Sequence, residues 1–461
     1  MDSIKITTEQ QLPEGWEYVP FNMFFNVVSI SDKKISQKEY LDNGKYPVID
    51  QGNLFIGGYS NDESLILKIS SPVIVFGDHT KCFKYVSFPF VAGADGIKVL
   101  EPQNGIYPKY AYYYCLSIDL TDRGYSRHFA FLKKCQFLIA PIETQQAIVN
   151  KIENLFDEIN EGIGRLKTAA QQIQQYRQSL LKNAFNGELT KEWRSKHADT
   201  LPSENELLTQ IQTTREKHHA QQLADWQTAV SQWEQNGKEG KKPSKPKAPT
   251  QAVKFEDNFA DLPSGWIWGK LSDLGELARG KSKHRPRNDK KLFGGKYPFI
   301  QTGEVRAANR IIKKYEQTYS EFGLEQSKLW QKGTLCITIA ANIAETAFLG
   351  FDACFPDSIV GFSASKAVLP EYIELFIKSA RTKIESYAPA TAQKNINLNT
   401  LENLIVPYCS LTEQTQIVAI LESKLTACDQ LAAELAKQLK QAELLKQAVL
   451  KAAFSGSLLD K

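Results

Sequence analysis

The chain has 461 residues, of which 42% are hydrophobic, as in globular proteins with two or three domains. Its 56 basic and 52 acidic residues leave a net charge of only +4, so any affinity for nucleic acid must come from local clusters of charge. The N-terminus lacks an apolar signal core, and no stretch approaches the roughly 18 uninterrupted apolar residues of a membrane span. Seven cysteines, without a C-x-x-C pair, suit reduced thiols in a cytoplasm and exclude an obvious zinc site.

Five short segments of the first half recur in the second half in the same order. They are LPEGW (12–16) and LPSGW (262–266), YPVIDQG (46–52) and YPFIQTG (297–303), LIAP (138–141) and LIVP (404–407), QQAIV (145–149) and TQIV (415–418), and LLKNAFNG (180–187) and VLKAAFSG (449–456). Because the order is kept along the whole chain, the matches indicate an internal duplication.

Each copy is predicted to contain a mixed α/β domain followed by one long helix, which makes the fold class α+β with internal duplication. Apolar runs such as SPVIVFGDHT and GTLCITIAAN predict strands, whereas PKYAYYYCLSI and PEYIELFIKSA predict helices. The expected divisions are 1–142 (first domain), 143–186 (first long helix), 187–255 (helical extension and linker), 256–408 (second domain) and 409–461 (second long helix).

Both long helices have apolar residues at alternating spacings of three and four over about 40 residues, which is typical of a coiled-coil seam about 60 Å long. We expect them to pair antiparallel, with a globular domain at each end and pseudo-two-fold symmetry. In the alternative, each helix lies alone on its own domain. Gly162 and Gly164 either weaken the first helix locally or let a neighbour approach closely.

The copies are joined by an extra segment. Residues 203–235 predict a polar helix, which either docks a partner or packs on its own chain through a possible apolar face. That face contains Leu207, Leu208, Ile211, Leu223, Trp226 and Trp233. Residues 236–251 are rich in Lys, Pro and Gly and predict a solvated linker.

The segment GELARGKS (275–282) fits the phosphate-binding pattern G-x-x-x-x-G-K-[ST]. That pattern requires a buried strand before the first glycine and a helix after the serine. The preceding residues lack a β-branched run, and the following residues are basic and interrupted by Pro286. We therefore expect Lys281 to contact a DNA backbone rather than ATP.

Motifs of catalysis are missing from the sequence. It contains no G-x-G-x-x-G, H-E-x-x-H, G-x-S-x-G or N-P-P-[YF], and its six histidines are scattered. Asp78 and His79 could act as a general base, but no nucleophile accompanies them, so a polar loop at a strand end is favoured. The sequence predicts a binding scaffold with no catalytic residue, no cofactor and no metal of its own.

The positive signal is a cluster of charge. Twelve basic residues and only two acidic residues lie between Arg279 and Lys314, around the repeated Y-P-x-I element. The twelve are Arg279, Lys281, Lys283, Arg285, Arg287, Lys290, Lys291, Lys296, Arg306, Arg310, Lys313 and Lys314. A weaker cluster in the first copy comprises Lys33, Lys34, Lys38, Lys45, Lys81, Lys84, Arg123, Arg127 and His128. Such clusters neutralise phosphates, while polar side chains beside them read base edges.

These features together resemble the specificity subunit (HsdS) of type I restriction–modification enzymes. LPEGW and LPSGW resemble the start of its target-recognition domains, LGELARGKS and YPFIQTGEV resemble segments within them, and LIVPYCSLTEQTQIV resembles the start of its conserved helix. AFNGELTKEWR resembles the end of the first conserved helix. APIETQQ and VPYCSLTEQ lack the family's double proline, and the second copy ends without E-L-T-x-x-W-R, which leaves open which terminal segment docks which partner.

The resemblance implies a non-catalytic reader of double-stranded DNA with a bipartite asymmetric site, one recognition domain per half-site, and a helix pair that fixes the gap. Its partners would be two methyltransferase subunits, which carry S-adenosylmethionine, and two restriction subunits, which use ATP and Mg²⁺.

The candidate DNA-binding residues follow the repeated elements and the basic clusters. When the chain is aligned without gaps from LIAP and LIVP, Arg127 and His128 fall opposite Gln393 and Lys394, in a loop that lies near DNA in the family. The candidates are Lys33, Lys34, Asp50, Gln51, Asn53, Asp78, His79, Thr80, Lys81, Arg127, His128, Lys281, Lys283, His284, Arg285, Arg287, Gln301, Thr302, Glu304, Arg306, Asn342, Gln393 and Lys394.

Three other functions stay open at the level of sequence. One is the recognition subunit of a fused restriction–methylation (type IIB-like) system, which neighbouring genes would distinguish. The second is an NTPase that uses 275–282, and the third is a structural coiled-coil adaptor. Nucleotide binding separates the second, and salt-dependent DNA binding separates the third.

Overall fold

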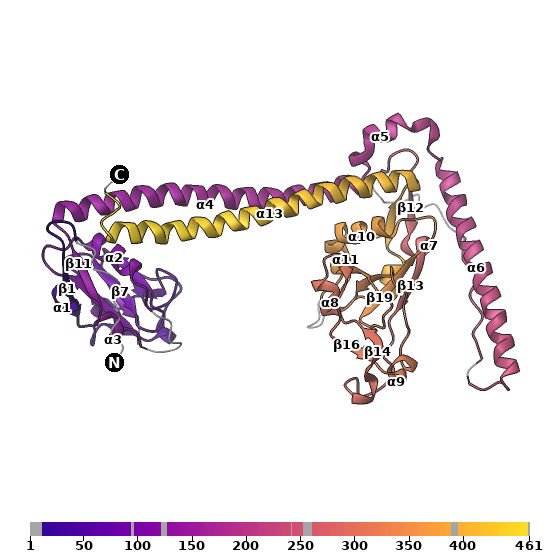
Figure 1. Ribbon diagram of the computed structural model, residues 1–461, viewed down its shortest axis with the longest axis horizontal. Helices are drawn as coiled ribbons and strands as arrows, with labels where there is room; N and C mark the ends of the chain where they lie inside the picture. The colour runs from indigo at the N-terminus through magenta and orange to yellow at the C-terminus, as the bar shows by residue number, and fades with distance from the viewer. Residues whose placement is uncertain are drawn as a thin grey trace. The chain divides into compact units, whose positions relative to one another are not determined.

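The computed structural model describes residues 12–93, 96–120, 127–240, 242–251, 261–388 and 395–459. The chain divides into two compact units (Figure 1). The first comprises Met1–Ala170 and Ala433–Lys461, and the second comprises Gln171–Ala432. Each unit contains one globular domain and parts of both long helices.

The first domain is built from two small sheets and a strand pair. Its strands are β1 (Glu17–Pro20), β2 (Phe25–Val28), β3 (Lys34–Ile35), β4 (Tyr46–Ile49), β5 (Gly58–Ser60), β6 (Ile66–Leu67), β7 (Val73–Gly77), β8 (Phe83–Val86), β9 (Phe90–Gly93), β10 (Ile97–Pro102) and β11 (Gln136–Ile139). Its α-helices are α1 (Phe21–Phe24), α2 (Pro108–Ser117) and α3 (Phe129–Leu132). One sheet has the order β2-β10-β7-β8 and the other β3-β9-β4-β5, with β6 also paired to β9, while β1 pairs with β11.

The second domain repeats this plan with a larger sheet. Its strands are β12 (Ile267–Lys270), β13 (Gly275–Arg279), β14 (Phe293–Phe299), β15 (Ile311–Ile312), β16 (Gln317–Tyr319), β17 (Leu335–Thr338), β18 (Thr346–Leu349), β19 (Ile359–Ala364) and β20 (Ile405–Tyr408). Its α-helices are α7 (Leu271–Leu274), α8 (Thr302–Ala307), α9 (Glu321–Glu325), α10 (Pro370–Ser379), α11 (Arg381–Ser386) and α12 (Leu398–Glu402). The sheet order is β13-β19-β17-β18-β15, with separate pairs β14-β16 and β12-β20.

The shared order of elements confirms the duplication and the mixed α/β class. The strand pair β1-β11 corresponds to β12-β20, and the sheet β2-β10-β7-β8 corresponds to β13-β19-β17-β18. The predicted apolar runs form β7 and β17, every residue of which is buried. Both predicted helices form as α2 and α10, and each has proline in its first turn, where the missing N–H leaves no helical hydrogen bond unmade.

The structure corrects the register of one sequence match. Ile139 pairs with Glu17 in the first domain, and Tyr408 pairs with Ile267 in the second. Ile139 and Tyr408, the last residues of β11 and β20, are 269 residues apart (408 − 139). The starts of α3 and α12, at Phe129 and Leu398, have the same separation (398 − 129). LIAP therefore lies three residues out of step with LIVP, and the residue equivalent to His128 is Asn397 rather than Lys394. Each of these two residues occupies the N-cap position of its short helix, and the Asn397 side chain accepts the Thr400 N–H there.

The long helices are α4 (Ile142–Phe185) and α13 (Leu411–Phe454), each of 44 residues, hence about 66 Å long. In the first unit the early part of α4 shares a core with the late part of α13, and in the second unit the relation is reversed. The residues involved are Ile148, Val149, Ile152, Val449, Leu450 and Ala453 in the first unit, and Leu180, Ala184, Ile417 and Leu421 in the second. Opposite ends meet in both units, so the helices pair antiparallel.

Helix α4 continues unbroken through Gly162 and Gly164. A Cβ added at either position would meet no atom within 4 Å, so close approach of a neighbour does not explain these glycines. We expect Gly164→Ala, at an exposed position, to raise the free energy of unfolding by about 1 kcal/mol, because alanine loses less backbone entropy in a helix. Urea denaturation followed by circular dichroism would measure the change. An unchanged or lower stability would show that glycine is needed here.

Two residues after the end of each long helix stands a left-handed glycine, beside a proline of the repeated LPxGW element. Gly187 (φ 81°) lies against Pro263 in the second unit, and Gly456 (φ 82°) lies against Pro13 in the first. Glycine is required for the backbone conformation, and at Gly187 a side chain would also clash with the proline ring. The repeats AFNG and AFSG therefore close the helices onto the start of the domain from the other copy.

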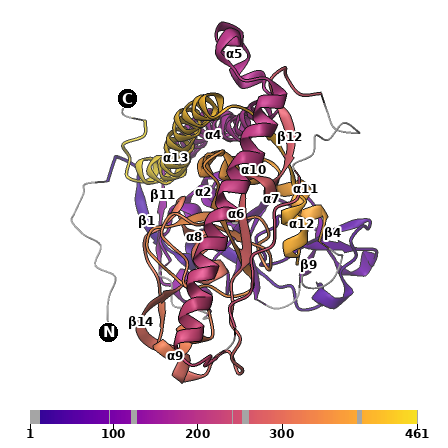
Figure 2. The same ribbon diagram turned by 90° about the vertical axis from the view of Figure 1, so that its right-hand side faces the viewer.

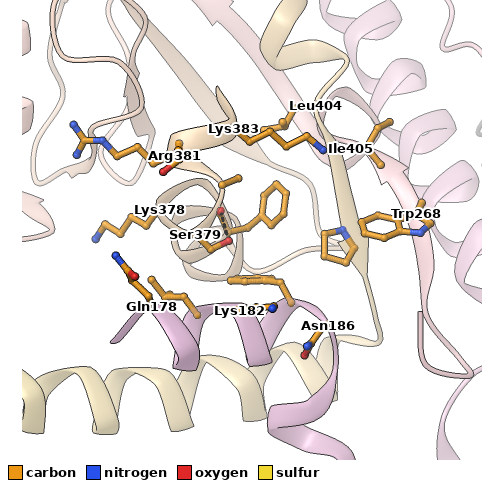
Figure 3. Close-up of a pocket in the computed structure, with 16 residues that line it drawn as sticks. Gln178, Lys182, Asn186, Trp268, Lys378, Ser379, Arg381, Lys383, Leu404 and Ile405 are labelled. Carbon is orange, nitrogen blue, oxygen red and sulfur yellow. Dashed lines mark hydrogen bonds between the residues drawn. The ribbon is translucent and has the colours of Figure 1, made fainter. Parts of the chain in front are cut away.

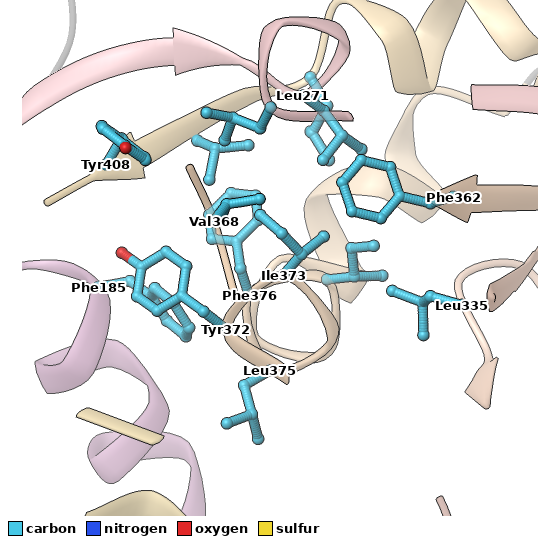
Figure 4. Packing of buried hydrophobic residues seen from close by; sticks show 14 of the residues in the cluster. Phe185, Leu271, Leu335, Phe362, Val368, Tyr372, Ile373, Leu375, Phe376 and Tyr408 are labelled. Carbon is cyan, nitrogen blue, oxygen red and sulfur yellow. The ribbon is translucent and has the colours of Figure 1, made fainter. Parts of the chain in front are cut away.

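The core of the second domain extends into the long helix. The ring of Phe185 lies 5.2 Å from that of Tyr372 and 5.3 Å from that of Phe376 (Figure 4). The Tyr372 hydroxyl donates to the Pro407 carbonyl at 2.7 Å, which satisfies its buried polar atom. The end of α4 is thus fixed to α10 and β20.

The segment between the copies is also ordered. The structure has α5 (Lys191–Lys196) and α6 (Glu204–Gln235), and Thr190 and Arg194 donate to the buried carboxylate of Glu413 at 2.7 and 2.6 Å. Leu207 and Ile211 of α6 are buried in the second domain, so its first half packs on its own chain (Figure 2). Among the described residues, the structure holds no helix with the length and hydrophobicity to cross a membrane.

Candidate nucleic-acid interface

Two predicted loops of the first domain meet. Thr80 donates its hydroxyl to the Gln51 carbonyl at 2.6 Å, and the backbone N–H of His79 donates to Gln51 Oε1 at 3.4 Å. The ends of β4 and β7 bring these loops together. A Cβ at Gly77 would collide with Thr80 and press on Gln51, so a glycine there allows the close approach. The exposed side chains of Asn53 and Thr80 lie on the solvent side of these loops.

Asp50 is held by contacts within the protein. Its carboxylate accepts the Gly52 N–H at 2.9 Å and lies 3.4 Å from the Lys84 ammonium. Lys84 is only 4% exposed and also donates to the Leu54 carbonyl at 2.5 Å. These contacts fix the shape of the loop and leave Gln51 and Asn53 nearer to solvent.

Asp78 and His128 are buried, at 4% and 1% exposure. Asp78 Oδ1 accepts the Phe129 N–H at 2.7 Å, and the Asp78 carbonyl accepts the His128 N–H at 2.9 Å. The His128 ring nitrogen Nδ1 lies 3.1 Å from the same carbonyl. These side chains therefore hold the segment that presents the exposed Arg127 and do not themselves face solvent.

A cavity of about 180 Å³ lies beside this segment. It is lined by Ile30, Lys34, Asp78, His79, Gly93, Gly96, Ile97, Lys98 and Arg127. Three cationic side chains and one carboxylate give it the electrostatics of an anion site. Lys98 was missed at the level of sequence, although a lysine within the otherwise apolar start of β10 was a signal that it faces away from the core.

The remaining candidates of the first domain lie at turns. Lys33 donates to the Ser64 carbonyl, while Lys34 is exposed at the start of β3. Lys81 has a φ of 59°, which a non-glycine residue rarely adopts. Its backbone N–H closes the turn by donating to the Gly77 carbonyl at 2.9 Å.

The candidates of the second domain gather at α8. Glu304 Oε2 accepts the Gln301 N–H at 2.7 Å and Oε1 accepts the Glu316 N–H at 3.1 Å, so this carboxylate holds the backbone. Gln301 also donates to Gln317 Oε1 at 2.9 Å and is exposed. Arg306 lies 3.5 Å from Asn342 Oδ1, which joins two residues predicted separately. Thr302 begins α8 beside them.

The basic cluster divides into paired and unpaired side chains. Ion pairs join Arg287 to Asp357 at 2.9 Å and Lys296 to Glu321 at 3.1 Å, and Arg310 pairs with two glutamates. A hydrogen bond of 2.8 Å joins His284 Nε2 and Asp289 Oδ2. Hydrogen bonds from the Lys291 backbone N–H and from His284 lower the pKa of Asp289. Arg279 donates to the Asp357 carbonyl, and Arg285 to the carbonyls of Ser282 and His284. Exposed lysines without an ion pair to any described residue are Lys281, Lys283, Lys290, Lys291, Lys313 and Lys314.

The phosphate-loop pattern adopts a different structure. Gly275–Arg279 is β13, paired antiparallel with β19, and no helix begins at Ser282. A Cβ at Gly280 would collide with the backbone carbonyls of Phe355 and Pro356, so this glycine serves packing. The segment therefore lacks the cradle of N–H groups that a nucleotide requires.

We expect Lys281→Ala to weaken DNA binding several-fold on all sequences alike, because the exposed lysine supplies charge and reads no base. Fluorescence anisotropy with target and non-target duplexes at several salt concentrations would measure this. The salt slope should fall by about 0.9, the value for one neutralised phosphate. A weakening confined to the target duplex would contradict the assignment.

Two candidates cannot be placed. Gln393 and Lys394 lie outside the described residues. In the part of the chain that the structure describes, no three His, Cys, Asp or Glu side chains are grouped as metal ligands.

A larger pocket, of about 670 Å³, lies in the second unit between α4, α10, α11 and the strands β12 and β20. Figure 3 shows Gln178 and Lys182 of α4 and Asn186, which follows the helix, on one side, and Lys378, Ser379 and Arg381 on another. Its apolar surface comes from Leu181, Phe185, Trp268, Phe376, Leu404, Ile405 and Pro407. None of the DNA-binding candidates lines it, so the pocket is distinct from the candidate interface.

Comparison with known proteins gives one family. The family model described as "Type I restriction modification DNA specificity domain" matches residues 13–167 and 263–441, which together are most of the chain. The Type I restriction enzyme EcoKI specificity subunit of Escherichia coli (strain K12) is 22% identical, over 97% of this chain and 90% of its own length.

Two solved structures share the fold. A chain from a structure described as "Structural basis underlying complex assembly and conformational transition of the type I R-M system" has a TM-score of 0.63 at 15% identity, over 97% of this chain and all of its own length. The HsdS subunit from Thermoanaerobacter tengcongensis has a TM-score of 0.51 at 15% identity, over 97% of this chain and 98% of its own.

Proposed function

Because this chain belongs to the family of type I restriction–modification DNA specificity proteins, and is the DNA sequence-specificity component of such a system, we propose that it reads a bipartite asymmetric site. Each domain reads one half-site, and the helices α4 and α13, which belong to both units, fix the gap between the half-sites. Half-sites must face a protein at separations set by the duplex turn of about 34 Å.

The observation that carries this proposal is a difference between equivalent loops. Asp50 and Gln51 follow β4, whereas the equivalent residues after β14 are Gln301 and Thr302, the first residue of α8. Two copies of one fold with different polar side chains at the same place would recognise two different base sequences. Such a protein would bind an asymmetric site rather than a palindrome.

Catalysis belongs to partner subunits in this proposal. Two methyltransferase subunits dock on the helical regions, carry S-adenosylmethionine and methylate N6 of an adenine that leaves the base stack. Two restriction subunits supply ATP- and Mg²⁺-dependent cleavage. The pocket between α4 and α10 supports a protein contact there, because its apolar surface is bordered by Lys182 and Lys383. The complex works in the cytoplasm, where the host DNA, S-adenosylmethionine and ATP occur.

The spacer between half-sites offers a direct test. Methylation by the complex with the methyltransferase subunit would be measured on duplexes in which the unspecified gap between the half-sites is longer by one or two base pairs. We expect methylation to fall sharply although both half-sites are intact, since the second domain would then face a different part of the groove. Unchanged methylation would refute the proposal that the helices fix the gap between the half-sites.

A neighbouring gene for a separate translocase would favour type I over a fused restriction–methylation system.

A further inference from the structure

The segment that follows α6 is held along that helix. Trp233 Nε1 donates to the Gly240 carbonyl at 3.4 Å, and Trp226 Nε1 donates to the Pro243 carbonyl at 3.1 Å. Further back along α6, Arg215 lies 3.5 Å from the hydroxyl of Thr250. The three contacts occur in antiparallel order, so the segment returns along the helix. The sequence predicted a solvated linker; the described part of this segment is largely exposed, and the structure adds that it is held along α6.

Prolines determine which side of the segment faces α6. Pro243, Pro246 and Pro249 recur every third residue and are each half-buried. A polyproline II helix has three residues per turn, so residues at this spacing share one edge. The side chains between them, among them Lys242, Lys245 and Lys247, are exposed. The prolines therefore form the seated edge, and the three lysines beside them remain exposed to solvent.

The charge of this segment is concentrated. Residues 236–251 contain five lysines and one glutamate, a net charge of 5 − 1 = +4, which equals the net charge of the whole chain. Lys242 and Lys245 lie over the rings of Trp233 and Trp226, at 5.8 and 5.9 Å from the ring centres. The described residues include no acidic partner within ion-pair distance of Lys238, Lys242, Lys245 or Lys247.

Helix α6 is itself fixed to the domain that carries the basic cluster. Arg215 forms an ion pair with Asp273 at 2.9 Å, and His218 lies 2.7 Å from Glu276 of β13. Figures 1 and 2 agree that the far end of α6 lies at the same end of this domain as β14 and α9. The exposed lysines of the segment are thus carried to the end of the domain where the exposed lysines 281–291 follow β13.

We propose that residues 242–247, here named the basic arm, contact the phosphate backbone of the duplex that flanks the half-site read by the second domain. The exposed side chains of residues 242–247 are three lysines and Ser244, with no apolar side chain among them, which suits phosphates better than a protein surface. In a polyproline II helix Lys242 and Lys245, three residues apart, would stand about 9 Å apart on one edge and Lys247 would lie on the neighbouring edge, so more than one phosphate can be met. The arm adds affinity and reads no sequence.

The test compares two variants of the full complex with its methyltransferase subunits. K242Q/K245Q/K247Q removes the charge, whereas K242R/K245R/K247R keeps it and serves as the matched control. Binding is measured over a salt series on a target duplex with a long flank beside the second half-site, and on the same target with that flank cut away.

We expect the glutamine variant to lower the slope of log affinity against log salt by about 2 to 3 on the long duplex, which is about 0.9 for each phosphate that the arm no longer neutralises. The slope on the cut duplex should match that of the unmodified protein, and the preference for target over non-target should not change. W226F/W233F, which keeps the charge but removes the indole donors, should lower the slope by a smaller amount.

An unchanged slope on the long duplex, or an equal decrease on both duplexes, would overturn the proposal. A variant that binds DNA normally but assembles poorly with the methyltransferase subunit would also overturn it, and would assign the arm to a protein interface.

Discussion

Arg306→Ala is expected to relax recognition at one position of the second half-site and to leave the first half-site unchanged. Arg306 is exposed on α8, and its guanidinium lies beside Asn342 from the loop after β17. Arginine gives two parallel hydrogen bonds to guanine, and its loss removes about 1 to 3 kcal/mol of discrimination against a wrong base. The variant should therefore methylate an additional set of sites that differ at one base.

The measurement is a methylation map of a host that carries the variant with its methyltransferase partner. Arg127→Ala is the matched control, because this exposed arginine lies in the first domain and should relax the other half-site. Lys313→Ala, an exposed lysine of the basic cluster, should weaken binding without changing the motif. An equal decrease of methylation at all sites in the Arg306 variant would show that this arginine contacts phosphate.

Arg310→Ala should destabilise the second domain by about 3 kcal/mol, because it leaves a buried carboxylate short of a partner. Glu374 is 0% exposed, and its two oxygens are met by Arg310 at 2.9 Å and Lys378 at 2.6 Å. Arg310 also pairs with Glu422 of α13 and precedes β15, with its carbonyl bonded to the Phe348 N–H. The Arg310 side chain thus joins the start of β15, which follows α8, to the helix α13.

Denaturant unfolding should show the destabilisation in the transition of the second domain. Glu422→Gln is the matched control: it removes the half-exposed partner alone and should cost less than about 1 kcal/mol. Recognition of the second half-site should fail at a lower temperature in the Arg310 variant than in the unmodified protein. Equal stability of the two variants would mean that Lys378 alone is enough to balance Glu374.

The duplication and the element types were predictable because they depend on local pattern. Apolar runs such as VIVFG have the composition of buried strands. Apolar residues at alternating spacings of three and four over a helix of 44 residues are explained by an α-helix that packs along one face. The exact register was not predictable from a four-letter match such as LIAP, because the two copies differ in length between the equivalent strands (β10 to β11 and β19 to β20) while the strand pairing is the same. The strand pairs β1-β11 and β12-β20, together with the starts of α3 and α12, fixed it.

The candidate site was predictable as a set of loops, but not residue by residue. Asp78 and His128 are fifty residues apart in sequence and meet through a backbone carbonyl, so the sequence did not distinguish them from the exposed Arg127. Gln145 and Gln414, each fully buried at the start of a long helix, were also missed. Gln145 accepts the N–H of the residue before α2, and Gln414 accepts the N–H of the residue before α10. Their occurrence in both copies, just after each LIxP segment, was the available signal.

The most direct test is a genome-wide map of N6-methyladenine in a host that carries this chain with its methyltransferase partner, compared with the same host without this gene. We expect a motif that depends on the gene and consists of two short, different half-sites separated by a fixed unspecified gap. If the partner is active and no such motif appears, or if the gene-dependent motif is continuous or palindromic, the proposal of one half-site per domain is wrong.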